Sequence, residues 1–269
     1  MSIITISRGS YSRGETIAKT LAVKLGYECI SREVLLEASK DFNIPEVKLV
    51  RAIHDAPSIL NSFTYGKEKY IAYIEAAILK YVLRDKVVYH GLAGHFFLKN
   101  ISHVLKVRIL ADTEERVQRE MAKEKIPYKE ALRLLKNDDE ERRKWSKHLY
   151  GIDTWDPSLY DLVIHVKRIT ADDAVGIIRD TLQLPQFQTT PASQRALEDL
   201  ALAAEVKATL VGVKPDIEVA AQNGIVYLQL KAAESQESAL SRDLERMAKG
   251  ITGVREVKFQ VRPIMPYSE

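Results

Sequence analysis

The segment that decides the fold is ITISRGSYSRGETIAKTLAVKLGY, residues 4–27. It begins with a β-branched run, typical of a buried strand, and continues as a helical pattern of apolar residues that ends at Gly26. Between the two, Gly9, Gly14 and Thr16 fit the spacing G-x-x-x-x-G-x-[ST]. A strand, a glycine loop and a helix in this order predict a loop whose backbone N–H groups can hold a phosphate.

The loop departs from this pattern at one position. Glu15 stands where a lysine would reach the β- and γ-phosphates of a nucleotide, and a carboxylate there repels them. We therefore expect Arg8 or Arg13 to supply the missing positive charge, and Thr16 to contact a magnesium ion bound with the nucleotide. The residues predicted to bind ATP are Arg8, Gly9, Ser10, Tyr11, Ser12, Arg13, Gly14, Glu15 and Thr16. A strand–turn–helix corner without a ligand is the alternative at this point.

The first two-thirds of the chain alternate between strand and helix patterns, which predicts an α/β fold with a parallel sheet. Strands are expected at 3–7, 27–30, 86–90, 103–111 and 160–166. Helices are expected at 14–25, 31–42, 45–56, 68–84, 113–124, 128–148 and 170–182. Thr170 is the expected N-cap of the last of these helices.

The pattern changes near residue 185. Residues 185–193 are rich in Pro, Gln, Thr and Ser and predict a linker, with domains at 1–184 and 194–265. We expect no helix or strand to couple the two domains rigidly. Beyond the linker the order is helix, hairpin, helix, strand, a small α+β module whose hairpin turn is Asn223-Gly224.

Composition limits the function classes. The chain of 269 residues is 46% hydrophobic and 29% charged, as is usual for a globular protein with a substantial core. A net charge of +3 is too small to indicate a nucleic-acid partner, but the first 189 residues hold 30 Lys/Arg against 26 Asp/Glu, which suits an anionic ligand there. The single cysteine, Cys29, excludes an intrachain disulfide or a cysteine-based metal site. Without a signal peptide or a transmembrane segment in the pattern, we expect a cytoplasmic location.

The opening segment resembles the start of the cytidylate kinase-like family, with Ser-Arg before a Gly/Ser-rich loop and IA…LA…LGY after it. SREVL at 31–35, VLKVRILADTEERVQREM at 104–121 and DEERRKW…YGIDTWDPSLYDLVI at 139–164 are similar to later parts of the family. The resemblance implies a P-loop kinase fold of three layers, with a five-stranded parallel sheet, a monophosphate-binding arm and a helical lid.

The resemblance also implies an activity, the transfer of a phosphoryl group from ATP with Mg²⁺ to a nucleoside monophosphate of the cytidylate type. It implies catalytic roles for Arg13, Asp139 and Arg142, and acceptor binding by Arg32, Gly91 and Arg143. From the residues alone, the charged run at 137–145 equally fits a solvated helix face. Glu15 and Leu92 replace two basic residues of the family pattern, which leaves open an alternative: a catalytically weak or inactive, nucleotide-responsive regulator.

Residues 194–262 resemble the BON family. The resemblance depends on the spacing of Val219, Gly224, Val226 and Leu228 and on GVREV at 253–257. It implies a small binding module without catalytic residues, of a kind used at membranes or between proteins. Because the charge of this module is balanced, we expect a protein partner or self-association rather than electrostatic attraction to a membrane, and no nucleic acid. A generic α+β module is the alternative.

Overall fold

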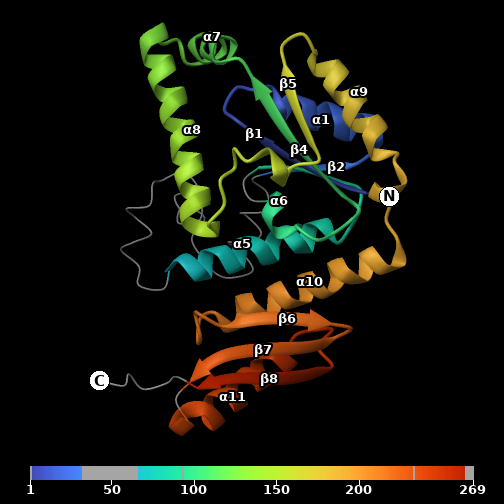
Figure 1. Cartoon of the computed structure of the whole chain (residues 1–269), viewed down its shortest axis with the longest axis vertical. Helices are drawn as coiled ribbons and strands as arrows, with labels where there is room; N and C mark the ends of the chain where they lie inside the picture. The colour runs from blue at the N-terminus through green and yellow to red at the C-terminus, as the bar shows by residue number, and fades with distance from the viewer. Residues whose placement is uncertain (1, 32–65, 92–93, 233, 264–269) are drawn as a thin grey trace.

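The computed structural model describes residues 2–31, 66–91, 94–232 and 234–263 (Figure 1). Its larger sheet has five strands in the order β2-β3-β1-β4-β5, and all adjacent pairs are parallel. The strands are β1 (Ile3–Arg8), β2 (Glu28–Ile30), β3 (Val87–His90), β4 (Val104–Ala111) and β5 (Leu162–Val166). The predicted five-stranded parallel sheet is confirmed, because each strand lies where an apolar run was found.

Helices cover both faces of this sheet. On one face α1 (Gly14–Leu25) and α9 (Ala171–Leu182) bury apolar side chains of their inner surfaces. On the other face lie α5 (Gly66–Val82) and the short α6 (Gly94–Phe97). Thr170 caps α9 as predicted, within a capping box. The helices expected at 31–42 and 45–56, together with Arg32 and Leu92, lie outside the described residues.

Two further helices, α7 (Thr113–Glu124) and α8 (Tyr128–Tyr150), form a hairpin beyond the end of β4 (Figure 1). The hairpin has a small apolar cluster of its own, built on Val117, Ala131 and Leu135. At the far end of α8, the Tyr150 ring packs against the rings of Phe96 and Phe97, with centroids 5.1 and 5.4 Å apart. The hairpin that the resemblance implied as a lid is therefore anchored at its C-terminal end.

A three-stranded sheet follows, made of β6 (Glu218–Gln222), β7 (Ile225–Ala232) and β8 (Glu256–Pro263). β6 and β7 are antiparallel, and β8 runs parallel to β7 beyond α11 (Glu234–Lys249). Asn223 and Gly224 both have positive φ, 50° and 77°, as a tight hairpin turn of this kind requires. The predicted order of elements in this module is confirmed.

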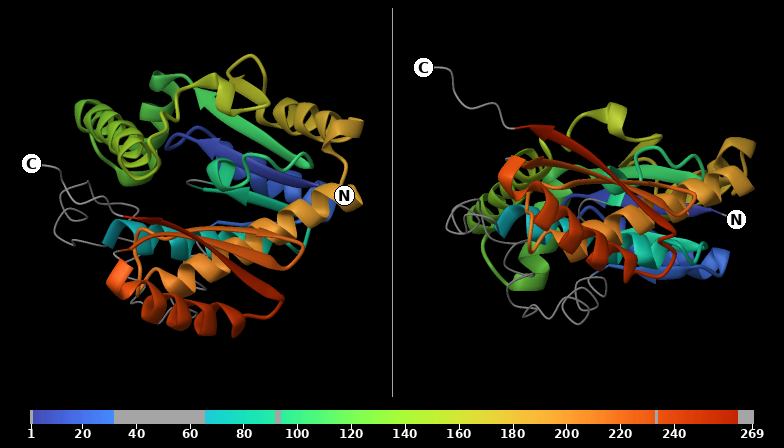
Figure 2. Two further views of the ribbon diagram at one scale, coloured as in Figure 1. Left: turned by 60° about the horizontal axis from the view of Figure 1, so that its bottom comes forward. Right: turned by 90° about the horizontal axis from the view of Figure 1, so that it is seen from below.

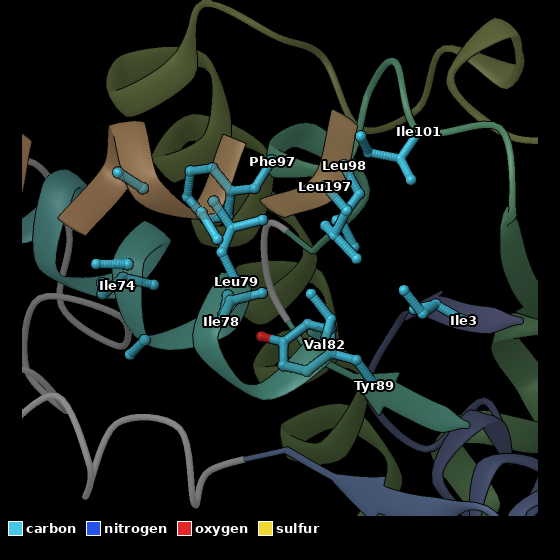
Figure 3. Packing of buried hydrophobic residues seen from close by; sticks show 14 of the residues in the cluster. Ile3, Ile74, Ile78, Leu79, Val82, Tyr89, Phe97, Leu98, Ile101 and Leu197 are labelled. Carbon is cyan, nitrogen blue, oxygen red and sulfur yellow. The ribbon is translucent and has the colours of Figure 1, made fainter. Parts of the chain in front are cut away.

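One helix joins the two sheets, contrary to the expected uncoupled linker. α10 (Pro191–Leu210) places Leu197 and a row of alanines in the core beside α5, and Val206 and Leu210 in the core of the small sheet. Figures 1 and 2 show α10 alongside α5, and Figure 3 shows Leu197 among the buried residues of α5, α6 and the strands. The expectation that no helix couples the two parts is wrong, because α10 has two apolar faces.

The segment before α10 is also attached to the larger sheet. It contains a 3-10 turn, η2 (Pro185–Phe187), and its last residues form the first turn of α10. Ser2 Oγ donates to the carbonyl of Phe187 at 2.7 Å, and His103 Nδ1 lies 2.8 Å from Ser193 Oγ in a buried contact. No helix in the described part of the chain is both long and apolar enough to cross a membrane.

Candidate active site

The glycine loop lies where β1 ends and α1 begins. Two of its non-glycine residues, Tyr11 and Arg13, have positive φ of 57° and 65°. A Cβ atom on Gly14 would lie 2.6 Å from the Cβ of Arg8, so the loop requires glycine there. The first backbone N–H groups of a helix have no intrahelical partners and its N-terminus attracts anions, so the loop and α1 together form a site that suits phosphate.

The unusual Glu15 lies on the first turn of α1 with two cations beside it. Lys19 Nζ is 2.8 Å from one carboxylate oxygen, and Arg8 Nη2 is 3.7 Å from the other. The hydrogen bond from Lys19, and then the charges of Lys19 and Arg8, hold the pKa of Glu15 below its usual range. The carboxylate is therefore ionised but locally balanced. Thr16, on the same turn, is exposed.

Arg8 is the cation at the end of β1, and the acid beside it is Glu15, 3.7 Å from its Nη2. Its Nε atom is buried without a hydrogen-bond partner among the described residues. Arg142 of α8 approaches from the other side and donates from Nη1 to the Arg8 carbonyl at 3.4 Å. Burial, followed by the charge of Arg142, lowers the pKa of Arg8. The charges of Arg8 and Arg142 act on each other next to a phosphate-type loop, and an anion bound there would favour both.

Arg13 points elsewhere. Its Nε donates to Glu115 of α7 at 3.0 Å, and its Nη2 forms an ion pair with the same oxygen. Glu115 also accepts from Arg119 at 2.9 Å. Of the two arginines that the sequence offered as replacements for the lysine, Arg13 is thus occupied by α7, whereas Arg8 has an unpaired buried nitrogen.

Arg116 of α7 also joins the lid hairpin to the loop, and sequence reasoning missed it. Its Nε donates to the Ser10 carbonyl at 2.7 Å, and its two terminal nitrogens bind Asp139 of α8 at 2.7 and 2.8 Å. Ser10 Oγ donates to Asp138 at 3.0 Å. Asp139, predicted to be catalytic, is therefore engaged with Arg116 at the mouth of the loop.

Arg143, predicted to bind the acceptor, is held within the lid region. Its guanidinium forms a two-point ion pair with Asp153, with the shortest distance 2.7 Å, and lies 4.6 Å from the centre of the Trp155 ring. Lys147 approaches Asp153 to 3.1 Å. The hydrogen bond from Arg143 holds the pKa of Asp153 well below its usual range. Arg143 can bind an acceptor only after leaving this ion pair.

A buried polar network lies at the carboxyl end of the sheet next to the loop. The Tyr160 hydroxyl lies 3.2 Å from Ser7 Oγ and 3.3 Å from His95 Nε2, and it accepts from Arg108 Nη1 at 3.2 Å. Burial, followed by the charge of Arg108, lowers the pKa of His95 to about 3, so this histidine is neutral. Gly91 directly follows β3, and a Cβ there would lie 2.6 Å from the Tyr89 hydroxyl.

The structure thus brings the predicted residues of the loop, Asp139 and Arg142 together, whereas Arg143 is held by Asp153. Gly91 directly follows β3, whose His90 pairs with Ile6 of β1. Arg116 was hidden in a helix interpreted only as heavily charged. Its one usable signal was its position directly before Val117, on the surface of α7 that becomes buried. No sequence motif marks Asp138 or Glu115 as a site residue, because each contacts a loop residue more than 100 positions away in the sequence.

Comparison with known proteins agrees with this geometry. The family model described as "Cytidylate kinase-like family" matches residues 3–168, more than half of the chain. A cytidylate kinase from Sulfolobus acidocaldarius is 27% identical over 65% of this chain and 91% of its own length. One from Archaeoglobus fulgidus is 29% identical over 69% of this chain and 97% of its own length.

Among solved structures, an uncharacterized protein from Eubacterium ventriosum is similar in fold, with a TM-score of 0.52 and 22% identity. The match covers 68% of this chain and 98% of that one. The similarity supports the fold of the part of the chain that it covers.

Proposed function

The chain belongs to the cytidylate kinase-like family, and we propose that it transfers the γ-phosphoryl group of ATP to a nucleoside monophosphate, with cytidylate as the expected acceptor. The family and the fold support a nucleotide kinase. Cytidylate is proposed as the acceptor because the relatives named above are cytidylate kinases. The roles proposed for the loop residues are based on their contacts.

The observation that carries the proposal is the pair of arginines at the loop. Arg8 and Arg142 approach each other from β1 and α8, and the buried Nε of Arg8 has no partner among the residues described. An anion between them relieves the repulsion of the two charges and gives the free nitrogen an acceptor. In this proposal Arg8 takes the role of the absent lysine, and Arg142 stabilises the charge of the transferring phosphoryl group.

The loop itself holds the other phosphate oxygens. Backbone N–H groups at residues 9–14 and the N-terminus of α1 are the donors for the phosphates of ATP. Thr16 is exposed, and its hydroxyl would hold Mg²⁺. A magnesium ion bound with ATP neutralises part of the phosphate charge. Glu15, balanced by Lys19 and Arg8, weakens this site without removing it.

Asp139 has a positioning role in this proposal. Because Asp139 binds Arg116 at two points, and Arg116 binds the Ser10 carbonyl, the pair holds α8 against the loop and so places Arg142. Arg143 and Gly91 remain proposed contacts of the acceptor, as does Arg32, which lies outside the described residues. Arg143 must first exchange Asp153 for a phosphate, which offers the same two-point geometry.

The experiment that tests this proposal is calorimetric titration of ATP with Mg²⁺ into Arg8→Ala, Arg13→Ala and wild-type protein. A charged hydrogen bond contributes about 1.5–3 kcal/mol, so Arg8→Ala should weaken ATP binding about tenfold or more. Arg13→Ala should have a smaller effect, because Glu115 already occupies that arginine. Arg179→Ala, an exposed arginine on α9, is the control. Equal affinity in Arg8→Ala and wild type would exclude Arg8 as the replacement for the lysine.

For the C-terminal module, the proposal is a BON-like binding role. It is supported by the close approach of Gly224 and Gly253, the two glycines on which the BON resemblance depends. A Cβ on Gly224 would lie 2.8 Å from the Gly253 carbonyl, and Arg255 N donates to the Gly224 carbonyl at 2.8 Å. The proposed partner is a protein or a second copy of the chain. Analytical ultracentrifugation over a concentration series tests self-association, and a constant monomer would leave only a separate protein partner.

A further inference from the structure

We propose that Tyr11 is a positioning residue that ties the lid hairpin α7–α8 to the phosphate loop. Its side chain lies against the hairpin, so its contribution to catalysis is to place the lid arginines. The catalytic consequence depends on the proposed kinase activity, whereas the tie itself depends only on contacts within the chain.

The backbone of Tyr11 is the first observation. Its φ of 57° lies in the left-handed region, which glycine adopts freely and which residues with a Cβ adopt rarely. Gly9 and Gly14 show that this loop uses glycine where its backbone is crowded. A tyrosine in a conformation that favours glycine indicates that its side chain makes contacts that compensate for the backbone cost.

The side chain of Tyr11 makes such contacts with both helices of the hairpin. Its ring packs against the apolar cluster of Val117, Ala131 and Leu135, which come from α7 and α8. Its hydroxyl donates to Glu124 Oε1 at 3.1 Å, and the Lys123 ammonium lies 5.4 Å from the centre of the ring. The ring therefore attaches the loop to the hairpin at the far end of α7.

A second attachment lies at the near end of α7. Arg116 binds the Ser10 carbonyl, one residue before Tyr11 in the loop, and Asp139 on α8. Arg116 and Val117 are adjacent on α7, and the Tyr11 ring packs on the cluster that contains Val117, so the two attachments hold the same turn of α7 to the loop. Through Asp139, the same packing sets the position of α8 and of Arg142. Removal of the ring should leave the phosphate donors intact and loosen the lid.

The decisive variant is Tyr11→Gly, because glycine suits the backbone conformation and removes only the side chain. We expect kcat with ATP, Mg²⁺ and cytidine monophosphate to fall about tenfold or more, while the Kd for ATP changes less than about threefold. Tyr11→Phe keeps the ring and should retain kcat within about threefold. Tyr128→Phe is the matched control: Tyr128 lies on α8 and donates to Glu114 at 2.9 Å, but no contact joins it to the loop among the residues described.

Hydrogen–deuterium exchange gives a readout independent of turnover. Tyr11→Gly should speed exchange in residues 113–124 and leave exchange in α9 unchanged, which separates a loosened lid from general destabilisation. Wild-type exchange and wild-type kcat in Tyr11→Gly would overturn the proposal, as would a loss of ATP affinity equal to the loss of kcat. If the wild type turns over no monophosphate, the proposed function fails, and the exchange result alone decides whether Tyr11 ties the lid.

Discussion

Replacement of Leu197 by alanine tests whether α10 belongs to the core of the nucleotide-binding part. Leu197 is fully buried and lies in the cluster that contains α5, α6 and strand residues of the larger sheet (Figure 3). If α10 were only the first helix of a separate module, a cavity at this site would destabilise that module alone. If the core is shared, the same cavity destabilises the part that binds ATP.

The magnitude follows from the burial of the side chain. Leucine-to-alanine changes in a core cost about 2–5 kcal/mol, depending on how far the surroundings collapse. For a chain of this size each kcal/mol lowers the melting temperature by about 2–4 °C, so Leu197→Ala should lower it by about 4–20 °C. Leu184→Ala is the matched control, since Leu184 is 43% exposed and its loss should cost no more than about 0.5 kcal/mol.

The assay is differential scanning calorimetry with and without ATP and Mg²⁺. A ligand that binds only the folded state raises the transition of the part that holds it, so ATP marks the transition of the nucleotide-binding part. We expect Leu197→Ala to lower this ATP-responsive transition. An unchanged ATP-responsive transition, with only a separate transition lowered, would refute the shared core.

Three further predictions concern the site. Glu15→Lys should strengthen ATP binding about tenfold, because it replaces a phosphate-repelling carboxylate with a cation, and unchanged affinity in calorimetry would contradict this. Arg142→Ala should lower kcat more than ATP affinity, because a lid arginine acts chiefly in the closed complex, whereas Lys144→Ala on the same helix should change neither. Buried His95 has a pKa of about 3 in the fold, below the roughly 6.5 of an unfolded histidine, so its contribution to stability is complete above about pH 6.5 and is lost as the pH falls toward 3, at up to about 1.4 kcal/mol per pH unit. His95→Gln should therefore flatten the fall of melting temperature with acid, and parallel curves for the two proteins would count against this origin.

Much of the fold could be predicted from the sequence, because buried parallel strands are short apolar runs and their positions are visible locally. The Asn223-Gly224 turn could be predicted because its signal is also local. The helices and strands against which α10 packs could not be predicted. Its apolar residues fall on two faces, and periodicity shows that a helix is buried without showing what buries it.

The candidate site could be predicted only in part. Spacing located the loop and its glycines, since these depend on neighbouring residues. Whether Arg8 or Arg13 replaces the lysine could not be decided, because it depends on Glu115, which lies about 100 positions further along the chain. The pairing of Arg116 with Asp139 was equally hidden, since many acids and bases alternate on these helices and only the packing of α7 on α8 selects the pair.

Formation of nucleoside diphosphate by the purified 269-residue chain decides whether this protein is a nucleoside monophosphate kinase. The protein is incubated with ATP, Mg²⁺ and each nucleoside monophosphate in turn, and the products are separated by anion-exchange chromatography. We expect equal amounts of ADP and cytidine diphosphate from ATP and cytidine monophosphate, with the rate greatly reduced in Arg142→Ala. A chain that binds ATP but forms no diphosphate from any monophosphate would contradict the proposed kinase activity.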